Sequence, residues 1–461
     1  MTSYDWIVVG GGPCGLTLAT YLPGRVLLVE GRETLGGCHA VHRDDEGRFG
    51  EHGPRYVNEC YVNLRNVLET IGLRWSDVFK PKSFGPDTVD GSAGWWRTFS
   101  AYETLVFSFL FLRLVVQPNY GRDTSLTETI ERYGFSKKTA SYIDAICRAS
   151  DGNGADKYPL HKFLRGFNDH LGPFYQPRRA NDTFLFDHWR SYLTTTRGVT
   201  VASGSPVRRL VHADGKATGV QLADGTTYAG HHVAFAVPPG PLTSILRASN
   251  LREPGLESFA RQTEYDEYFC ATFHFKALHA KRLVTHRGFK TTPWKLLYAE
   301  VDVVDEPTAI LSVAAADLGA VSPVTGKTID QSTRDEVVAE ILRQLPLSAA
   351  TKETFVGAVT TDMVRRKGRW HNKSEAYVST SSTRSFGPFL RCCRGAYTVG
   401  GHNEQSWYPF TSFESACANA LHFLGRTQTT PTFTPLTVLR LLLVFLVAYA
   451  AYVVARKSFF S

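Results

Sequence analysis

The chain has 461 residues with 43% hydrophobic and 20% charged content, which is enough to bury the cores of two domains. Its 51 basic and 43 acidic residues give a net charge of +8, but lysine and arginine are scattered and no nucleic-acid-binding module is recognisable, so we expect no nucleic acid partner. The eight cysteines show neither CxxC spacing nor a cluster with histidines, and we expect reduced thiols and no metal site.

The first predicted element is a strand over residues 5–9, which runs directly into a glycine-rich turn and a helix. A second apolar strand follows at 26–29. This order of strand, turn, helix and strand is the context in which a GxGxxG motif binds a dinucleotide. Gly10 permits the tight turn, Gly12 lets the backbone approach a pyrophosphate, and Gly15 lets the helix pack closely on the strand.

The acidic residue Glu30 closes the second strand and is placed to accept hydrogen bonds from a ribose diol. Its charge disfavours a 2′-phosphate, so we expect an adenine dinucleotide other than NADP. Pro13 and Cys14 lie at the helix start, where free backbone amides hold phosphates. The alternative, a glycine turn with a purely structural role, is disfavoured because strand, helix and acidic residue occur together.

The segments after Glu30 indicate which dinucleotide is bound. A glycine pair is followed by a Gly-Pro-Arg-Tyr segment, and with these the sequence resembles the flavin-containing amine oxidase superfamily, which includes monoamine and polyamine oxidases, protoporphyrinogen oxidases and carotenoid desaturases. The resemblance implies that the glycine pair passes close to the pyrophosphate and ribityl chain of FAD, and that the later segment runs beside the isoalloxazine ring. The implied FAD-binding residues here are Arg32, Gly36, Gly37, Gly53, Pro54, Arg55 and Tyr56.

Two later stretches are similar to the other FAD segments of that superfamily. Residues 206–237 alternate like strands around a turn, and the resemblance places Val207 near the adenine. Residues 396–420 predict a strand, a loop and a helix. The resemblance implies that the start of this helix faces the pyrimidine end of the flavin, where the helix dipole can stabilise reduced flavin. The implied binding residues are Gly400, Gly401, Glu404, Ser412 and Phe413. Superfamily members that bind flavin covalently carry it on a cysteine about a helix's length upstream of the closing loop. Cysteines 392 and 393 instead lie directly before that strand, so the resemblance implies non-covalent FAD.

Four residues are candidates for the substrate side. Arg55 either orients an anionic substrate or stabilises reduced flavin, and its alternative role is a plain ion pair. His52 is either a proton carrier or, the favoured reading, a partner in a structural hydrogen bond. The resemblance places Trp407 and Tyr408 in an aromatic wall of the substrate cage, and packing without a substrate role is the alternative.

These blocks predict an α/β fold. A Rossmann-like FAD-binding domain would be assembled from residues 1–75, 195–245 and 390–426, with an interleaved α+β substrate domain over 76–194 and 246–389. The apolar run 105–112 is interrupted by Arg113 and predicts a substrate-domain helix. If it touches lipid, it marks a mouth for an apolar substrate.

The C-terminus predicts a membrane attachment. Residues 427–435 are rich in threonine and proline and indicate a linker, and residues 436–455 predict a transmembrane anchor that is apolar on all sides. Arg440 would snorkel at one end, and the basic pair after residue 455 would stop the span at the other. No secretory signal is recognised, so the expected location is a membrane, with the catalytic part facing the cytosol and the lipid bilayer as partner. A buried core helix is the alternative.

The predicted function is that of a membrane-anchored FAD-dependent oxidoreductase, which removes a hydride from a C–N or C–C bond of a small-molecule substrate. The sequence identifies neither the substrate nor an oligomeric state. One alternative is a non-redox flavoenzyme resembling UDP-galactopyranose mutase, which shares the glycine pair and the His-Gly-Pro spelling. The other is a flavin-binding membrane protein without catalytic activity.

Overall fold

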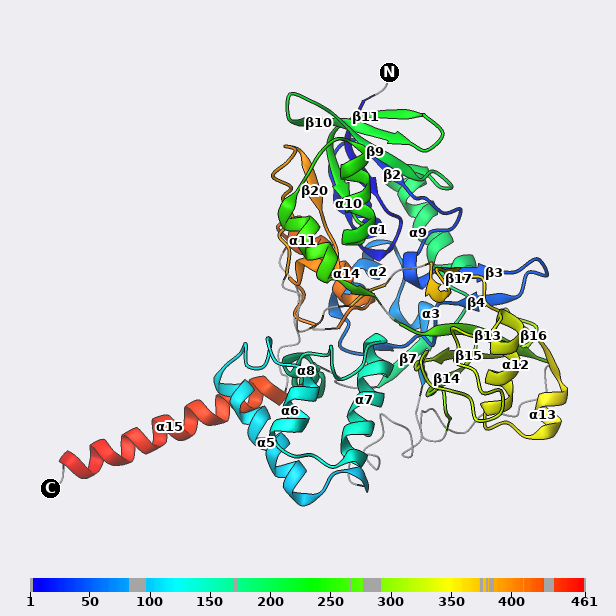
Figure 1. Ribbon diagram of the computed structural model, residues 1–461. Helices are drawn as coiled ribbons and strands as arrows, with labels where there is room; N and C mark the ends of the chain where they lie inside the picture. The colour runs from blue at the N-terminus through cyan, green and yellow to red at the C-terminus, as the bar shows by residue number, and fades with distance from the viewer. Residues whose placement is uncertain are drawn as a thin grey trace.

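The computed structural model describes residues 3–82, 97–169, 173–265, 267–276, 292–373, 376–378, 380, 385–408, 410–426 and 435–459. In these ranges the chain forms a mixed sheet with helices on both faces, a smaller antiparallel sheet and a group of helices (Figure 1).

The mixed sheet has seven strands in the order β8-β2-β1-β11-β10-β9, with β20 beside β11. Strands β8, β2, β1, β11 and β20 run parallel, while β9 and β10 extend the sheet with antiparallel pairing. The parallel part therefore combines three stretches of chain that are far apart in sequence, drawn blue, green and orange in Figure 1. The strands are β1 (Tyr4–Val9), β2 (Val26–Val29), β8 (Thr200–Ala202), β9 (Val207–Ala213), β10 (Lys216–Leu222), β11 (Thr227–Phe235) and β20 (Ala396–Thr398).

Alternating side chains of β1 enter two different cores, as the pleat of a strand requires. Val8 packs in the core that contains the helices of one face, and Ile7 and Val9 pack in the core of the opposite face. The helices and helical turns of the first face are α1 (Pro13–Tyr21), α2 (Val62–Thr70), η2 (Asp182–Phe186), α9 (Asp187–Ser191), η3 (Tyr192–Thr196) and α14 (Phe413–Phe423), and those of the second are α10 (Pro239–Ala248) and α11 (Pro254–Gln262).

The antiparallel sheet has the order β14-β15-β13-β16, and one face is covered by α12 through Val337 and Ile341. The opposite face meets the hairpin of β3 and β4, where Val41 and Phe49 pack against Ile310. The elements are β3 (Val41–Arg43), β4 (Phe49–Glu51), β13 (Phe269–Phe275), β14 (Leu296–Val301), β15 (Ala309–Ala315), α12 (Arg334–Gln344), α13 (Ala349–Glu353) and β16 (Phe355–Val359). Short strands complete this part: β5 (Val57–Asn58), β6 (Phe79–Lys82), β7 (Phe174–Pro177), β12 (Glu264–Tyr265), β17 (Met363–Arg366), β18 (Arg369–Asn372) and β19 (Tyr377–Val378).

The helical group lies below the mixed sheet in Figure 1 and contains the helix expected around 105–112. Its helices begin at serine caps, since Ser100 and Ser125 each accept a hydrogen bond from the amide of a glutamate three residues later. The elements are α3 (Trp75–Val78), α5 (Ala101–Val116), α6 (Leu126–Arg132), α7 (Lys137–Asp151) and α8 (Leu160–Asp169).

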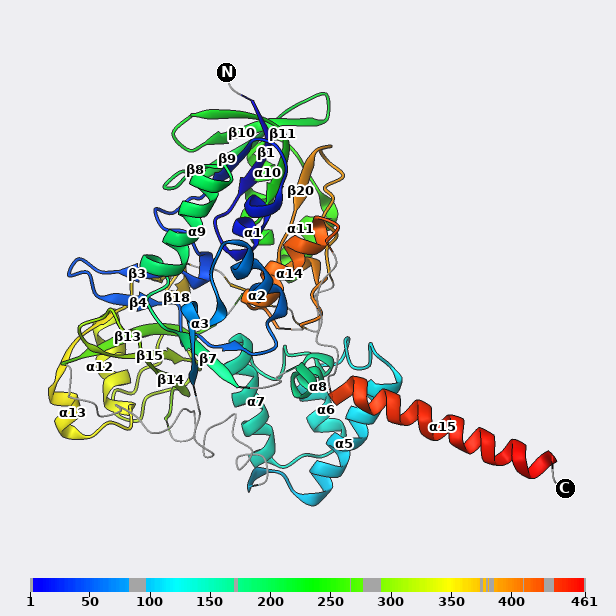
Figure 2. The ribbon, with the colours of Figure 1, turned by 180° about the vertical axis from the view of Figure 1, so that it is seen from behind.

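The C-terminal helix α15 (Pro435–Phe459) corrects one expectation. Its first turns pack on α5, where Leu436 is buried and Arg440 Nε donates to the carbonyl of Val115 at 3.1 Å, and the rest projects from the body (Figures 1 and 2). Among the described residues no helix combines the length and apolarity needed to cross a membrane, so the predicted transmembrane anchor over 436–455 and the location derived from it are wrong.

The span predicted over residues 436–455 includes a charged residue, Arg440, and turns that pack on α5. After Arg440 the chain has fifteen uncharged residues, 441–455, before the next basic pair. In a helix they extend about 22 Å, against the roughly 30 Å of a bilayer core. Of the predicted linker, residues 427–434 lie outside the described residues, and Pro435 begins α15.

Candidate dinucleotide and substrate site

The turn between β1 and α1 admits only glycine at two positions. Gly10 has a φ of +111°, and a Cβ there would lie 2.5 Å from the carbonyl oxygen of Ala236, at the end of β11. A Cβ on Gly15 would lie 1.8 Å from the carbonyl oxygen of Gly10. These contacts let α1 start directly against the carboxyl ends of β1 and β11, which is where open α/β sheets bind their ligands.

Gly12 and the pair Gly36 and Gly37 form a cradle in front of α1. Gly12 is the N-cap of α1 with an extended backbone, and a Cβ on Gly37 would lie 3.0 Å from its Cα. Gly36 has a φ of +115° and would place a Cβ within 2.4 Å of the Phe186 ring. The Gly36 amide donates to the carbonyl of Gly11 at 2.8 Å, which holds the two loops together. Bare backbone therefore faces a helix N-terminus, the arrangement that suits a pyrophosphate.

Glu30 lies at the end of β2 beside this cradle. Its carboxylate accepts hydrogen bonds from the amide of Gly11 at 2.5 Å and from the amide of Arg32 at 2.9 Å. Pro206 Cα lies 3.5 Å from the Cβ position of Gly31, so the segment that leads to Val207 passes at the same end. Roles for Arg32, Val207 and Glu30 at an adenosine remain predictions, and all three positions lie around this end of the cradle.

The C-terminal segment of residues 396–423 packs beside the same glycine cradle. Cys14 Sγ lies 3.4 Å from the carbonyl oxygen of Val399, directly before Gly400 and Gly401. Phe413, the first residue of α14, packs on His39 with ring centroids 4.6 Å apart. The start of α14 therefore lies beside the Gly37–His39 turn (η1).

Side-chain caps fix the geometry of that unit. Ser412 Oγ accepts the amide of Ser415 at 3.1 Å and caps α14. The Gly400 amide donates to Asn403 Oδ1 at 2.9 Å in the turn η4 (Gly401–Asn403), and Glu404 follows with a φ of +49°. The strand, turn and helix predicted for residues 396–420 are confirmed, whereas the flavin contacts assigned to them remain predictions.

A cavity of about 110 Å³ opens beside Gly53, Pro54 and Arg55. Gly53 has a φ of +149°, and a Cβ there would lie 3.4 Å from the hydroxyl of Tyr268. Tyr56 follows as a half-buried residue before β5. The remaining lining comes from α7, the antiparallel sheet and two later loops: Arg148, Ser150, Gly152, Leu297, Ala314, Ala316, Ala376, Val378 and Thr411. The cavity thus lies between the Gly-Pro-Arg segment and the substrate-domain sheet.

Charge is concentrated at this cavity. Arg55 donates one guanidinium N–H to the carbonyl of Cys38, while its Nε is buried and makes no hydrogen bond among the described residues. Burial raises the pKa of Glu51 to about 7, although the nearby positive charge of Arg55 opposes the rise. Burial also holds the pKa of His39 well below its usual value. Two cations line the cavity, Arg55 and Arg148. Arg148 is paired with Asp144, whereas the buried Nε of Arg55 has capacity left to bind an anionic group.

His52 takes the structural role that the sequence favoured. Its Nδ1 lies 2.7 Å from Oδ2 of Asp362, and both side chains are buried. The His52 ring also packs on Tyr268, with centroids 5.4 Å apart. Sequence reasoning missed Asp362, Tyr268 and Glu51, because the first two lie more than 200 residues away in segments without a motif, and Glu51 is distinguished only by its burial.

Trp407 and Tyr408 lie elsewhere. Trp407 Nε1 donates to Glu414 at 3.1 Å, and Tyr408 is buried with its ring 5.1 Å from that of Tyr61. Tyr408 lines a second cavity, of about 360 Å³, together with Arg122, Lys162 and Arg165. It does not line the 110 Å³ cavity beside Arg55. The geometry therefore favours the packing alternative for both aromatic residues.

Comparison with known proteins agrees with this geometry. Residues 8–71 match the model of the NAD(P)-binding Rossmann-like domain. The chain is 25% identical over 283 residues to the 15-cis-phytoene desaturase of Arabidopsis thaliana, a match that covers 52% of this chain and 49% of the desaturase. It thus spans about half the length of that curated relative.

Solved structures extend the likeness to most of the chain. A putrescine oxidase bound to putrescine superposes with a TM-score of 0.66 at 12% identity, covering 92% of this chain and 100% of the other. An oxidoreductase from Methanosarcina mazei gives 0.63 at 13% identity, covering 91% and 100%. The chain therefore shares the fold of these two proteins. This likeness agrees with the resemblance on which the sequence prediction depended, and the two proteins are named as an oxidase and an oxidoreductase, the class that was predicted.

Proposed function

We propose that the protein binds FAD non-covalently and is an FAD-dependent oxidoreductase acting on a C–N or C–C bond of a small molecule. The proposal depends on the cradle formed by Gly12 and Gly37. The two loops approach so closely there that a Cβ on Gly37 would lie 3.0 Å from the Cα of Gly12. Relatives that are a phytoene desaturase and a putrescine oxidase support the reaction class.

The residues present fit such a cofactor. The bare backbone of Gly12 and Gly37 at the start of α1 would hold the pyrophosphate, and Glu30 would accept the ribose hydroxyls. The start of α14, capped by Ser412, would place its positive dipole end at the flavin. Bound FAD supplies the hydride acceptor.

On the substrate side, Arg55 and Tyr268 would act from the wall of the 110 Å³ cavity. Arg55 has a buried N–H to offer to an anionic group, either on the substrate or on reduced flavin. Tyr268 lies against Gly53 and restricts how deeply a substrate enters.

The test is a Gly12→Val variant. The position has an ordinary φ, and the nearest atom to its Cβ is 3.7 Å away, so the variant is expected to fold. The added methyl groups fill the cradle, and we expect flavin content to fall at least tenfold, measured by absorbance of the purified protein and by chromatography of the released cofactor. The control is Gly387→Val, where open space surrounds the Cβ position.

Folded Gly12→Val protein with the flavin content of the wild type would disprove the proposed site. The reaction class is tested separately by anaerobic bleaching of the wild-type flavin with amines, porphyrinogens and polyenes. Turnover of a UDP-sugar that requires reduced flavin would favour the non-redox alternative instead.

A further inference from the structure

Behind the Gly53–Arg55 segment, three metal-ligating side chains from distant parts of the chain converge. One ligand atom each of His52, Cys270 and Asp362 lies within 4.8 Å of the others, and all three residues are at most 3% exposed. His52 follows β4, Cys270 belongs to β13, and Asp362 directly precedes β17. We propose that this cluster, completed by His42, binds a zinc-type divalent cation.

His42 provides the fourth donor. It lies on β3, and its Nε2 is 3.5 Å from Oδ1 of Asp362. This nitrogen is buried and makes no hydrogen bond within the part of the chain that the structure describes, although buried polar atoms are normally paired. A cation bound beside Asp362 would accept coordination from Nε2 of His42.

The donor set matches the chemistry of zinc. Two imidazole nitrogens, one carboxylate oxygen and one thiolate sulfur are the ligand types found in closed tetrahedral sites. The charges also balance, because the Asp362 carboxylate and the Cys270 thiolate neutralise a dication inside a buried pocket. In the structure the Cys270 thiol donates to Oδ1 of Asn372 at 3.4 Å, and cation binding would replace this hydrogen bond when the thiol loses its proton.

The position gives the cation a task distinct from flavin chemistry. His42 and His52 lie on the two arms of the β3–β4 hairpin, whereas Cys270 and Asp362 belong to the substrate-domain part. A bound cation would cross-link these parts directly before Gly53, which lines the candidate cavity. Its removal is expected to lower thermal stability and loosen the Gly53–Arg55 segment, without removing a group that touches the dinucleotide cradle.

The experiment uses the full chain, purified without an affinity tag that binds metals. We expect about one zinc per chain by mass spectrometry of the metal content. After chelation, Co²⁺ alone should produce visible d–d bands and a thiolate-to-cobalt charge-transfer band. Cys270→Ser should abolish the charge-transfer band, whereas Cys393→Ser, a buried cysteine elsewhere in the chain, should leave it intact.

His42→Gln covers the case in which Cys270→Ser does not fold, because His42 lies nearer the surface. This variant should weaken Co²⁺ binding by about 10- to 100-fold or more and lower the thermal midpoint of the zinc form but not of the chelated form. Folded wild-type protein that holds no zinc and gives no Co²⁺ spectrum would overturn the proposal and leave a hydrogen-bonded His52–Asp362 pair. A charge-transfer band that survives in folded Cys270→Ser would overturn it as well.

Discussion

Among single residues, the buried Glu51 gives the stability of the protein a specific pH dependence. Its pKa of about 7 in the folded protein exceeds the usual 4.5, because burial penalises the carboxylate more than Arg55 stabilises it. Between pH 4.5 and 7 the folded state therefore binds more protons than the unfolded state. The contribution of Glu51 to the free energy of unfolding is full below pH 4.5 and is lost as pH rises through 7, by about 3 kcal/mol.

Glu51→Gln, which mimics the neutral carboxyl group, should remove that dependence. We expect the free energy of unfolding of the wild type, minus that of the variant, to fall by roughly 3 kcal/mol between pH 4 and pH 8, measured by urea titration at both values. Glu131→Gln on the exposed face of α6 is the control and should leave the difference flat. A difference that rises with pH would contradict the assignment of a neutral carboxyl group to the folded protein.

The same residues show where sequence reasoning succeeds and where it ends. Gly10 and Gly15 could be assigned to a tight turn and a close packing contact because both requirements are local: Gly10 has a positive φ, and a Cβ on Gly15 would meet the carbonyl oxygen of Gly10. The contact between His52 and Asp362 joins positions 310 residues apart, and neither the spacing nor the composition of the chain indicates it. The proposed cation site is equally hidden from the sequence, since its four donors come from separate segments of the chain.

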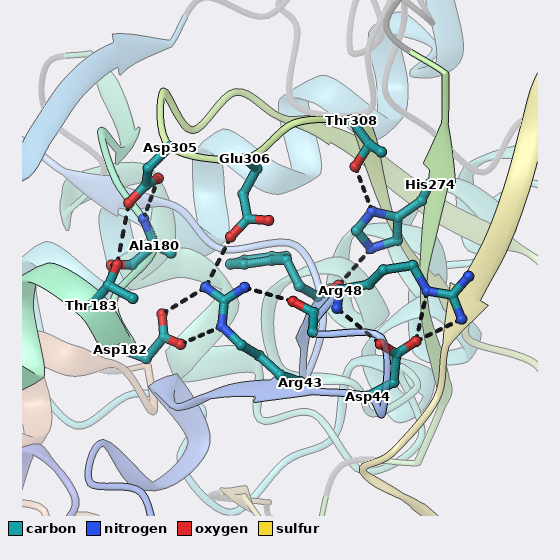
Figure 3. Close-up of polar contacts among 12 residues, drawn as sticks. Arg43, Asp44, Arg48, Ala180, Asp182, Thr183, His274, Asp305, Glu306 and Thr308 are labelled. Carbon is teal, nitrogen blue, oxygen red and sulfur yellow. Dashed lines mark hydrogen bonds and ion pairs between the residues drawn. The ribbon is translucent and has the colours of Figure 1, made fainter.

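At the scale of elements, the β3–β4 hairpin depends on charge as well as on apolar packing. Figure 3 shows Arg43 bridging Asp182, at 2.8 Å, and Glu306, at 2.9 Å. In the same view His274 lies between Thr308 and the hairpin, where it contacts the carbonyl of Phe49 at 2.7 Å. These contacts hold one end of the hairpin, while its other end leads into the Gly53–Arg55 segment.

Replacing Arg43 should therefore loosen the hairpin. We expect Arg43→Gln to lower the free energy of unfolding by about 1 kcal/mol, with a smaller effect in high salt, because two partly buried charge-assisted hydrogen bonds are lost. Thermal unfolding at two salt concentrations measures the change. Arg74→Gln is the control, since Arg74 pairs with Asp77 on the open surface and should cause no measurable change. Equal effects of the two variants would contradict a special role for the hairpin pairs.

Elements near the dinucleotide motif were predictable, and those of the substrate side were not. The strand expected over 5–9 is β1 (Tyr4–Val9), and the one expected over 26–29 is β2, because a buried parallel strand has an uninterrupted apolar sequence. The aromatic wall expected from Trp407 and Tyr408 stays a prediction, because its geometry depends on the loop before α14, which carries no motif. That loop turns Trp407 toward Glu414.

At the scale of the whole molecule, α15 carries a large exposed apolar surface. Between residues 441 and 451 its apolar side chains face solvent, and Phe445 is 68% exposed. Contiguous apolar surface of this kind promotes self-association. A chain that ends after Arg426 should remain monodisperse at concentrations where the full chain aggregates, as measured by light scattering.

The shortened chain should also keep its flavin, because the cradle and α14 precede the cut. A matched control is the full-length chain with Leu442→Lys and Phe445→Lys, two exposed positions that should improve solubility without removing the contacts of Leu436 on α5. Loss of flavin in the shortened chain but not in this control would mean that α15 supports the site through α5.

The late arrival of β20 in the central sheet has a consequence for biosynthesis. This strand joins β11 only when residues 396–398 have left the ribosome, and α14, which seals the same end of the sheet, follows later still. A nascent chain therefore carries an unsealed nucleotide fold until residues 396–423 have been made, with the inner edge of β11 open to mispairing. If the proposed function holds, stable cofactor loading should wait for these residues, and the flavin supply at that stage should set how much protein matures.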